Sequence, residues 1–172
     1  DKWTKGVGQV LEALVIAKAT ALYGDVPYSQ AFDSENFPTP IFDRQEDVYA
    51  ALQITLDDAI INLSNPTGLA FGANDFIYQG NVSKWKSLAH SLKARLYLHT
   101  QNYQQAIINA KLGIRNTSED ALIPHGTSQG QNNNQNYDFF RVSRAGDTGF
   151  EDTFLNELMQ QRINGSNTKT DE

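Results

Sequence analysis

The residues best suited to bind a ligand lie in a stretch rich in amide groups and aromatic rings. Two asparagines and two aromatic residues are the candidates: Asn134, Asn136, Tyr137 and Phe139. Amides hydrogen-bond neutral hydroxyl groups, and exposed aromatic rings stack on the faces of sugar rings. We therefore expect these residues to bind a neutral, hydroxylated ligand. The other interpretation is that the rings only hold an irregular segment against the protein body.

A second group of aromatic residues surrounds a proline-rich stretch nearer the N-terminus. Its members are Tyr28, Phe32, Phe37 and Phe42. Pro38 and Pro40 prevent a helix in this stretch, so we expect it to be a loop. For this group we favour a structural role, in which the rings pin the loop onto the helical body.

The histidines and aspartates show no spacing typical of catalysis. His90 and His99 are too far apart on one predicted helix for the i, i+4 arrangement that lets two imidazoles share a metal. We expect both to be structural or surface residues. Asp57 and Asp58 are adjacent, and adjacent helical side chains point about 100° apart, so they cannot act on one substrate atom as a pair.

An acidic cluster at Asp147, Glu151 and Asp152 lacks the ligand spacing of a calcium loop. The chain has no cysteine, which excludes disulfides, thiolate catalysis and cysteine-ligated zinc. Motifs for phosphate, dinucleotide or serine-hydrolase chemistry are also lacking. The sequence therefore predicts a protein that is not an enzyme and has no metal or cofactor.

Charge and hydropathy exclude two further classes. Fourteen basic residues stand against 20 acidic ones, for a net charge of −6, and the basic residues do not cluster on one helical face. Nucleic acid is therefore not expected as a partner. The chain shows no apolar run approaching the roughly 20 residues of a bilayer span. Because it begins at Asp1 without a signal region, we expect a processed or excised segment.

Apolar residues recur at intervals of three and four in four segments of the first 123 residues, which predicts four amphipathic helices. The first runs from Gly6 to Tyr23 and should bury Val7, Val10, Leu11, Leu14, Ala17 and Ala21. Residues that favour helix ends flank the four segments: Gly24, a capping box of Asp43 and Glu46, Asn65, Ser83, Asn102 and Gly113.

The third and fourth helices have the spacing of a tetratricopeptide-like pair. Small and large residues fall at the offsets of that repeat: Ala94, Tyr97, Tyr103, Ala106 and Gly113. Small side chains let two helix axes approach to roughly 8–10 Å. We predict an all-α fold of tetratricopeptide-like helix pairs with long loops. A helical-repeat scaffold that binds other proteins, with no small ligand, is one functional interpretation of this pattern.

The chain is expected to form one segment, residues 1–172, with four parts. Residues 1–123 form the helical scaffold, 124–149 a polar loop, 150–163 a further helix and 164–172 a disordered tail.

Three ordered stretches resemble the SusD/RagB family of outer-membrane lipoproteins. The first, Leu22–Tyr28, reads Leu-Tyr-Gly-Asp-Val-Pro-Tyr. The second runs from Pro40 to Leu63, and the third, Asp75–Leu96, contains Asp-Phe-Ile-Tyr-Gln-Gly-Asn followed by Lys-Trp. Their order and spacing are similar to the family's over the chain up to about Arg115. A generic helical repeat has no reason to contain the first or third stretch.

The resemblance implies a surface-exposed outer-membrane lipoprotein that binds a glycan or another nutrient without cleaving it. It also implies a SusC-type TonB-dependent porin as partner, and contact with the membrane only through a lipid anchor that this chain does not contain. No ligand-site motif of the family transfers residue by residue. The four candidate binding residues therefore rest on their chemistry alone.

Overall fold

The computed structural model describes residues 1–126, 128, 133–144, 154 and 156–159. The chain divides into two units, Asp1–Ile123 and Pro124–Glu172, and each is described by itself.

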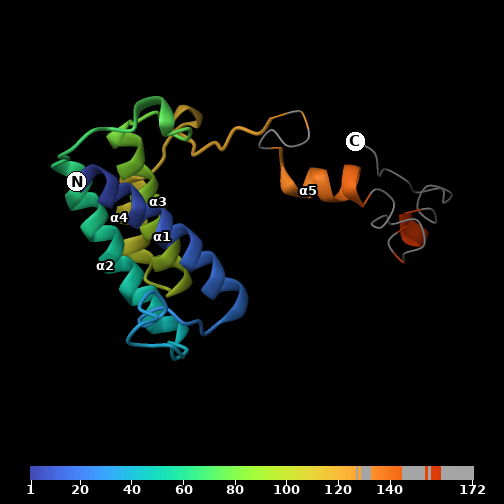
Figure 1. The fold of residues 1–172 in the computed structure, drawn as a ribbon, viewed down its shortest axis with the longest axis horizontal. Helices are drawn as coiled ribbons and strands as arrows, with labels where there is room; N and C mark the ends of the chain where they lie inside the picture. The colour runs from blue at the N-terminus through green and yellow to red at the C-terminus, as the bar shows by residue number, and fades with distance from the viewer. Residues whose placement is uncertain (127, 129–132, 145–153, 155, 160–172) are drawn as a thin grey trace. The chain divides into compact units, whose positions relative to one another are not determined.

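The first unit consists of helices packed on one another (Figure 1). Its helices are α1 (Lys2–Tyr23), α2 (Gln45–Ser64), α3 (Val82–His99) and α4 (Tyr103–Leu112), with short 3-10 turns η1 (Gly72–Asn74) and η2 (Thr117–Glu119) in the loops. α1 packs along α2, α3 packs on both, and α4 packs on α3. The only extended pairing within residues 1–123 is a single antiparallel bridge between Val26 and Asp43. The predicted all-α fold is confirmed.

Helix α1 begins at Lys2 and not at Gly6 as predicted, because the Asp1 carboxylate accepts a hydrogen bond from the Thr4 backbone N–H at 3.2 Å. Its end at Tyr23 was predicted correctly. Gly24 follows with a φ of 77°, a conformation that favours glycine.

The buried face of α1 differs from the predicted one. Its members are Trp3, Gly6, Val7, Val10, Ala13, Ala17 and Thr20. Leu11 and Ala21, which we expected to be buried, are exposed. By length and composition α1 is apolar enough to cross a membrane, although its sequence contains no long uninterrupted run of apolar residues. In this fold, however, one side of α1 is buried in the core of the first unit.

The core between α1, α2 and α3 is formed by large side chains that are almost completely buried. Trp3, Leu52, Leu56, Trp85 and Leu96 are each at most 2% exposed. Burial of each such side chain contributes about 1.5–3 kcal/mol. Close helix packing adds to this, since a Cβ atom on Gly6 would lie only 2.7 Å from Leu63 Cγ.

Two predicted N-caps are wrong. Asp43 and Glu46 do not form a capping box, because Arg44 occupies the cap position of α2 without a side-chain hydrogen bond and the Asp43 carboxylate binds the preceding loop. For α3 the cap is Asn81 and not Ser83, and the Asn81 side chain accepts from Lys84 N at 3.1 Å. An asparagine two residues earlier reaches the free N–H groups that Ser83, already inside the helix, cannot cap.

The α3–α4 turn was predicted more accurately. Asn102 caps α4 by accepting a hydrogen bond from Gln105 N, and Gly113 follows the last residue of the helix. Gly113 also lies against α3, where a Cβ atom would be 2.5 Å from Ser91 Oγ. The three residues between α3 and α4 are too few for anything but an antiparallel pair. A tetratricopeptide-like arrangement is compatible with this pair and stays a prediction.

The second unit contains helical turns where we expected a polar loop over 124–149. One α-helical turn, α5 (Gln135–Tyr137), continues as a π-helix, η3 (Asp138–Ser143). The turn forms because Asn134 provides an N-cap, a role hidden within the asparagine-rich run. Of the predicted helix over 150–163, the structure describes residues 154 and 156–159, and all of these are helical. The rest of that helix and the predicted tail at 164–172 lie outside the described residues.

Candidate functional site

Asn134 and Asn136, two of the four candidate binding residues, lie at the start of α5. The Asn134 side-chain oxygen accepts hydrogen bonds from the backbone N–H groups of Asn136 and Tyr137, at 2.9 and 3.2 Å. Asn134 therefore has a structural task as the helix cap, and its acceptor oxygen is already used. Asn136 is exposed, and its side chain is placed on the surface of the turn.

The two candidate aromatic residues are also on the surface. Tyr137 is 56% exposed and Phe139 is 48% exposed. Phe139 packs edge-on against Phe140, with 5.1 Å between ring centroids, and the Arg144 Cζ atom lies 6.0 Å from the centroid of the Phe139 ring. The described contacts thus join Phe139 to Phe140 and Arg144, and none of them joins it to Tyr137.

The sequence did not predict that Arg144 would lie beside Phe139. Arg144 follows the π-helix η3 as its C-cap, and its backbone N–H donates to the Phe139 carbonyl at 2.8 Å, which is the five-residue hydrogen bond of a π-helix. An α-helical pattern would not have predicted this proximity. A guanidinium beside an aromatic face can hydrogen-bond a ligand that stacks on the ring. We call Phe139, Phe140 and Arg144, together with the exposed Tyr137 of the adjoining turn α5, the aromatic cluster.

The aromatic residues of the first loop behave differently from one another. The Tyr28 hydroxyl donates to Glu12 Oε1 at 2.7 Å and lies 3.3 Å from Thr55 Oγ1, so this ring ties the loop to α1 and α2. Burial raises the pKa of Tyr28. Phe32 packs edge-on against Tyr28, with 6.5 Å between ring centroids, but its ring and that of Phe42 are 76% and 70% exposed. The expected pinning role therefore fits Tyr28 best.

Asp43 organises the same loop. Its Oδ2 accepts from Tyr28 N at 2.9 Å and from Ser29 N at 2.8 Å, and its Oδ1 accepts from Ser29 Oγ at 2.7 Å. The hydrogen bonds from Ser29, with that from Tyr28, lower the pKa of Asp43.

Asp75 organises the loop before α3 in a similar way. It is 7% exposed. Its Oδ1 accepts from Ile77 N at 3.1 Å and Tyr78 N at 3.0 Å. Its Oδ2 accepts from Gly80 N at 2.9 Å and from the Trp85 indole at 2.7 Å. Burial alone would raise the pKa of Asp75, but these hydrogen bonds outweigh it and lower the pKa.

The histidines have structural partners. His90 Nδ1 lies 3.0 Å from Asn109 Oδ1, which joins α3 to α4. His99 Nδ1 lies 3.1 Å from the Tyr49 hydroxyl, which joins the end of α3 to α2. Within the part of the chain that the structure describes, no three His, Asp or Glu side chains converge as a metal site. The acidic cluster at 147–152 lies outside the described residues.

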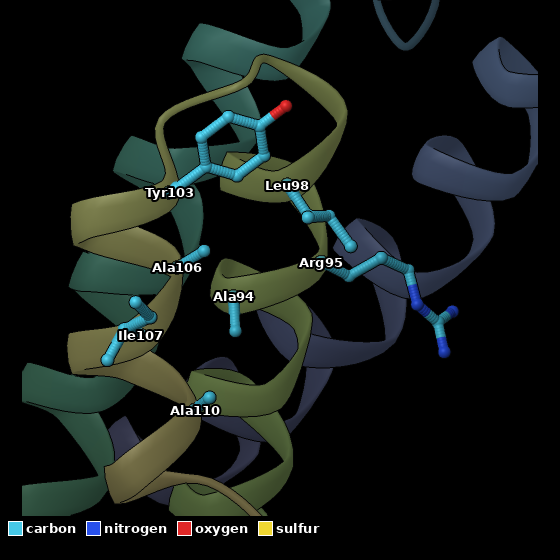
Figure 2. Close-up of a pocket in the computed structure, with 7 residues that line it drawn as sticks. All are labelled: Ala94, Arg95, Leu98, Tyr103, Ala106, Ile107 and Ala110. Carbon is cyan, nitrogen blue, oxygen red and sulfur yellow. The ribbon is translucent and has the colours of Figure 1, made fainter.

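An apolar groove runs between α3 and α4. Figure 2 shows the side chains that line it: Ala94, Arg95, Leu98, Tyr103, Ala106, Ile107 and Ala110. Its volume is about 410 Å³. Sequence reasoning had identified Ala94, Tyr103 and Ala106 as contacts within the helix pair, but it did not predict that they would border an open surface.

Comparison with known proteins identifies the family of the chain. The family model described as "SusD-like_2: Starch-binding associating with outer membrane" matches residues 1–163. The chain belongs to this SusD-like family. The resemblance seen in the sequence is therefore confirmed.

Two solved structures are similar to this SusD-like chain. A SusD/RagB family protein from Bacteroides thetaiotaomicron has a TM-score of 0.63 and 28% identity, over 70% of this chain and 26% of that protein. A SusD homolog from Bacteroides uniformis has a TM-score of 0.57 and 31% identity, over 67% of this chain and 26% of that protein. The matched part thus spans about a quarter of these relatives. No curated protein matches the chain.

The stretches that carry the SusD-like resemblance serve the scaffold in this structure. Val26 pairs with Asp43, while Asp75 and Trp85 are buried and bonded to one another. These residues fix the two long loops between helices. They therefore have a structural role in this chain, and they do not by themselves locate a ligand.

Proposed function

We propose that this SusD-like chain binds a nutrient, with neutral glycans as the leading class, at the outer membrane and without cleaving it. The observation that carries the proposal is the family match over residues 1–163, whose description names starch binding and association with the outer membrane. Surface exposure of the protein and attachment through a lipid are part of the same proposal.

The aromatic cluster is the proposed contact surface for the glycan. Tyr137 and Phe139 present exposed rings, Asn136 adds an exposed amide, and Arg144 supplies donors beside the Phe139 ring. Rings with adjacent hydrogen-bonding groups suit a hydroxylated sugar, which has one apolar and one polar aspect. Asn134 contributes indirectly, because its cap fixes the turn that displays Tyr137.

Isothermal titration of the chain with a panel of neutral oligosaccharides tests this proposal. We expect binding, and we expect Tyr137→Ala and Phe139→Ala each to weaken it about tenfold, which corresponds to about 1.4 kcal/mol. Phe32→Ala is the matched control, because that ring is 76% exposed in a different loop. Equal losses in all three variants, or no binding to any sugar, would contradict the site. Chromatography of the sugars after incubation should show them unchanged.

We propose a SusC-type TonB-dependent porin as the partner in uptake. This part rests on the family resemblance. Detergent-solubilised porin should co-elute with the lipid-anchored protein on size exclusion. If the porin elutes separately from the protein over a range of salt concentrations, the proposed partnership is wrong.

The second candidate function is a helical scaffold that binds other proteins without a small ligand. The open groove between α3 and α4 favours it. Failure of every sugar to bind, together with capture of a helical peptide by the groove, would place this alternative ahead.

A further inference from the structure

Two adjoining polar pockets lie where the start of α2 meets the end of α3. Their volumes are about 410 and 350 Å³, which is the size of a small-ligand site. Three residues line both pockets: Glu46, Tyr49 and Thr100. The other lining residues fall within 45–53 of α2 and within 97–102 of α3 and the turn after it. The two pockets therefore form one continuous polar region of the first unit.

The glutamines of α2 that line the pockets donate hydrogen bonds to the protein itself. Gln45 Nε2 donates to the Thr20 carbonyl at 2.6 Å, and Gln53 Nε2 donates to the Lys93 carbonyl at 3.2 Å. The Gln53 side-chain oxygen, in contrast, is buried and accepts no hydrogen bond from any described residue. A buried acceptor without a donor is unfavourable. This oxygen therefore favours a ligand that donates a hydrogen bond.

The charge of the region is negative. Glu46 is the only carboxylate among the described residues that line the pockets, and no lysine or arginine is among them. Lys93 donates to the Gln53 carbonyl at 3.3 Å, but its charge is balanced by Asp57 at 2.7 Å. Both pockets also lie at the C-terminal end of α3, which is the negative end of the helix dipole. The region therefore favours a positively charged ligand.

The turn after α3 supplies two amides for a hydroxylated ligand. Gln101 has a φ of 60°, a conformation that favours glycine, and its side chain lines the first pocket. A glutamine in this conformation costs stability, which indicates that its side chain has a function. Asn102 lines the second pocket. Its oxygen accepts from Gln105 N at 3.2 Å, and its NH₂ group has no partner in the described part of the chain.

We propose that the two pockets bind a small hydroxylated ligand that has a protonated amine, such as an amino sugar. The amine binds the Glu46 carboxylate, while the hydroxyl groups donate to the Gln53 oxygen and accept from the amides of Gln101 and Asn102. The site lies wholly in the first unit. The proposal does not rest on the binding of neutral glycans by the aromatic cluster.

Arg44 occupies Glu46 when no ligand is bound. Its Nη2 lies 2.7 Å from Glu46 Oε1, and both side chains are more than half exposed. An exposed pair of this kind contributes little to stability, so a ligand amine can replace the guanidinium. Arg44 precedes α2 without a side-chain cap. Removal of this side chain should therefore free the carboxylate without weakening the helix.

NMR titration of the isotope-labelled complete chain with glucosamine and with N-acetylglucosamine at pH 7 tests the proposal. The two sugars have the same ring and hydroxyl groups, but only glucosamine has a charged amine. We expect glucosamine to bind at least about tenfold more tightly, because a charge-assisted hydrogen bond is stronger than a neutral one. It should also shift the backbone amide signals of residues 45–53 and 97–102.

Three variants at the start of α2 separate the effect of Glu46 from that of charge in general. Glu46→Gln should abolish the preference for glucosamine. Asp47→Asn removes the same charge at an exposed residue that lines neither pocket, and it should keep the preference. Arg44→Ala should tighten glucosamine binding about threefold, because the competing cation is removed. A purely structural role of Arg44 would not produce this gain.

Gln101→Gly separates ligand binding from folding. Glycine suits the φ of 60°, so this variant should resist urea at least as well as the parent chain. Its affinity for glucosamine should nevertheless fall about fivefold, since one hydrogen bond is lost. Tyr137→Ala, in the aromatic cluster, should leave glucosamine binding unchanged. Failure of one site can therefore be told apart from failure of the other.

Four results would overturn the proposal. The first two are absence of glucosamine binding and equal affinity for the two sugars. The third is a loss of preference in Asp47→Asn as large as that in Glu46→Gln. The fourth is binding of lysine amide as tight as that of glucosamine, because the pockets would then recognise an amine alone and not a hydroxylated ligand.

Discussion

The two long loops of the helical unit are held by the same kind of residue but in different surroundings. Asp43 holds the loop over 24–44, and Asp75 holds the loop over 65–81. All four donors to Asp75 are N–H groups, which cannot accept a hydrogen bond. One donor to Asp43 is the Ser29 hydroxyl, which can also accept. Because Asp75 is buried and Asp43 is partly exposed, we expect the two loops to tolerate the same substitution very differently.

Asp75→Asn should have the largest effect. An amide oxygen can satisfy only one pair of N–H donors, and its NH₂ group would then face the other pair. We expect unfolding in urea at pH 7 to show a loss of about 2–4 kcal/mol, since buried donors would be left without acceptors. Asp58→Asn, at an exposed position of α2, is the control. A loss below about 1 kcal/mol would show that the Asp75 hydrogen bonds contribute little.

Acid should destabilise the helical unit through the same carboxylates. The folded-state pKa values of Asp75 and Asp43 are lowered below the value of about 3.9 for an unfolded aspartate. Their contribution is therefore fully present above that value and is lost as the pH falls through the folded-state values. Urea unfolding at several pH values below about 5 should show this loss in the parent chain and a smaller loss in Asp75→Asn. If the free energy of unfolding fell equally with pH in both proteins, Asp75 would not contribute to the destabilisation by acid.

Alkali should act on the Asp75 loop through Tyr78. Burial, with the charges of Asp120, Glu119 and Asp75, raises the pKa of Tyr78 to about 12. A raised pKa means stability that is complete below the unfolded value of about 10 and declines as the pH rises towards about 12. Tyr78→Phe should flatten this decline relative to the parent chain. It should also cost stability at pH 7, because the hydroxyl donates to the Glu119 carbonyl at 2.8 Å.

Asp43→Asn should have the smallest effect. The amide oxygen can still accept from the Tyr28 and Ser29 N–H groups, while the NH₂ group can donate to Ser29 Oγ. We expect a change below about 1 kcal/mol in the free energy of unfolding. In a Ser29→Ala background the cost of Asp43→Asn should rise, because the hydroxyl acceptor is missing. Equal costs in both backgrounds would contradict this explanation.

The helices were predictable from apolar periodicity, whereas the hydrogen-bond partners of the loop aspartates were not. Leu52, Leu56 and Leu63 recur at helical spacing, so α2 follows from local sequence. Asp43 has the type and position of a helix cap, yet its carboxylate binds residues 28 and 29. Local rules cannot decide between two nearby sets of N–H donors, since the choice depends on the path of the loop.

The candidate site was predictable in chemistry but only partly in geometry. Tyr137 and Phe139 are exposed, as a ligand contact requires, but Asn134 is used as a cap and Arg144 was missed. The groove between α3 and α4 could not be read from the sequence either. Its residues have the pattern of a buried helix contact, and only the arrangement of the helices shows that no other helix of residues 1–123 covers their outer side.

The position of the two tryptophans gives the molecule a natural optical probe. Trp3 and Trp85 are the only tryptophans of the chain, and they are 2% and 1% exposed in the core of the first unit. Their emission should therefore shift to the red when this core unfolds, with no added label. A sugar that contacts only the aromatic cluster around Tyr137 should leave the same signal unchanged. Intrinsic fluorescence can thus separate loss of the scaffold from loss of ligand binding in every variant proposed above.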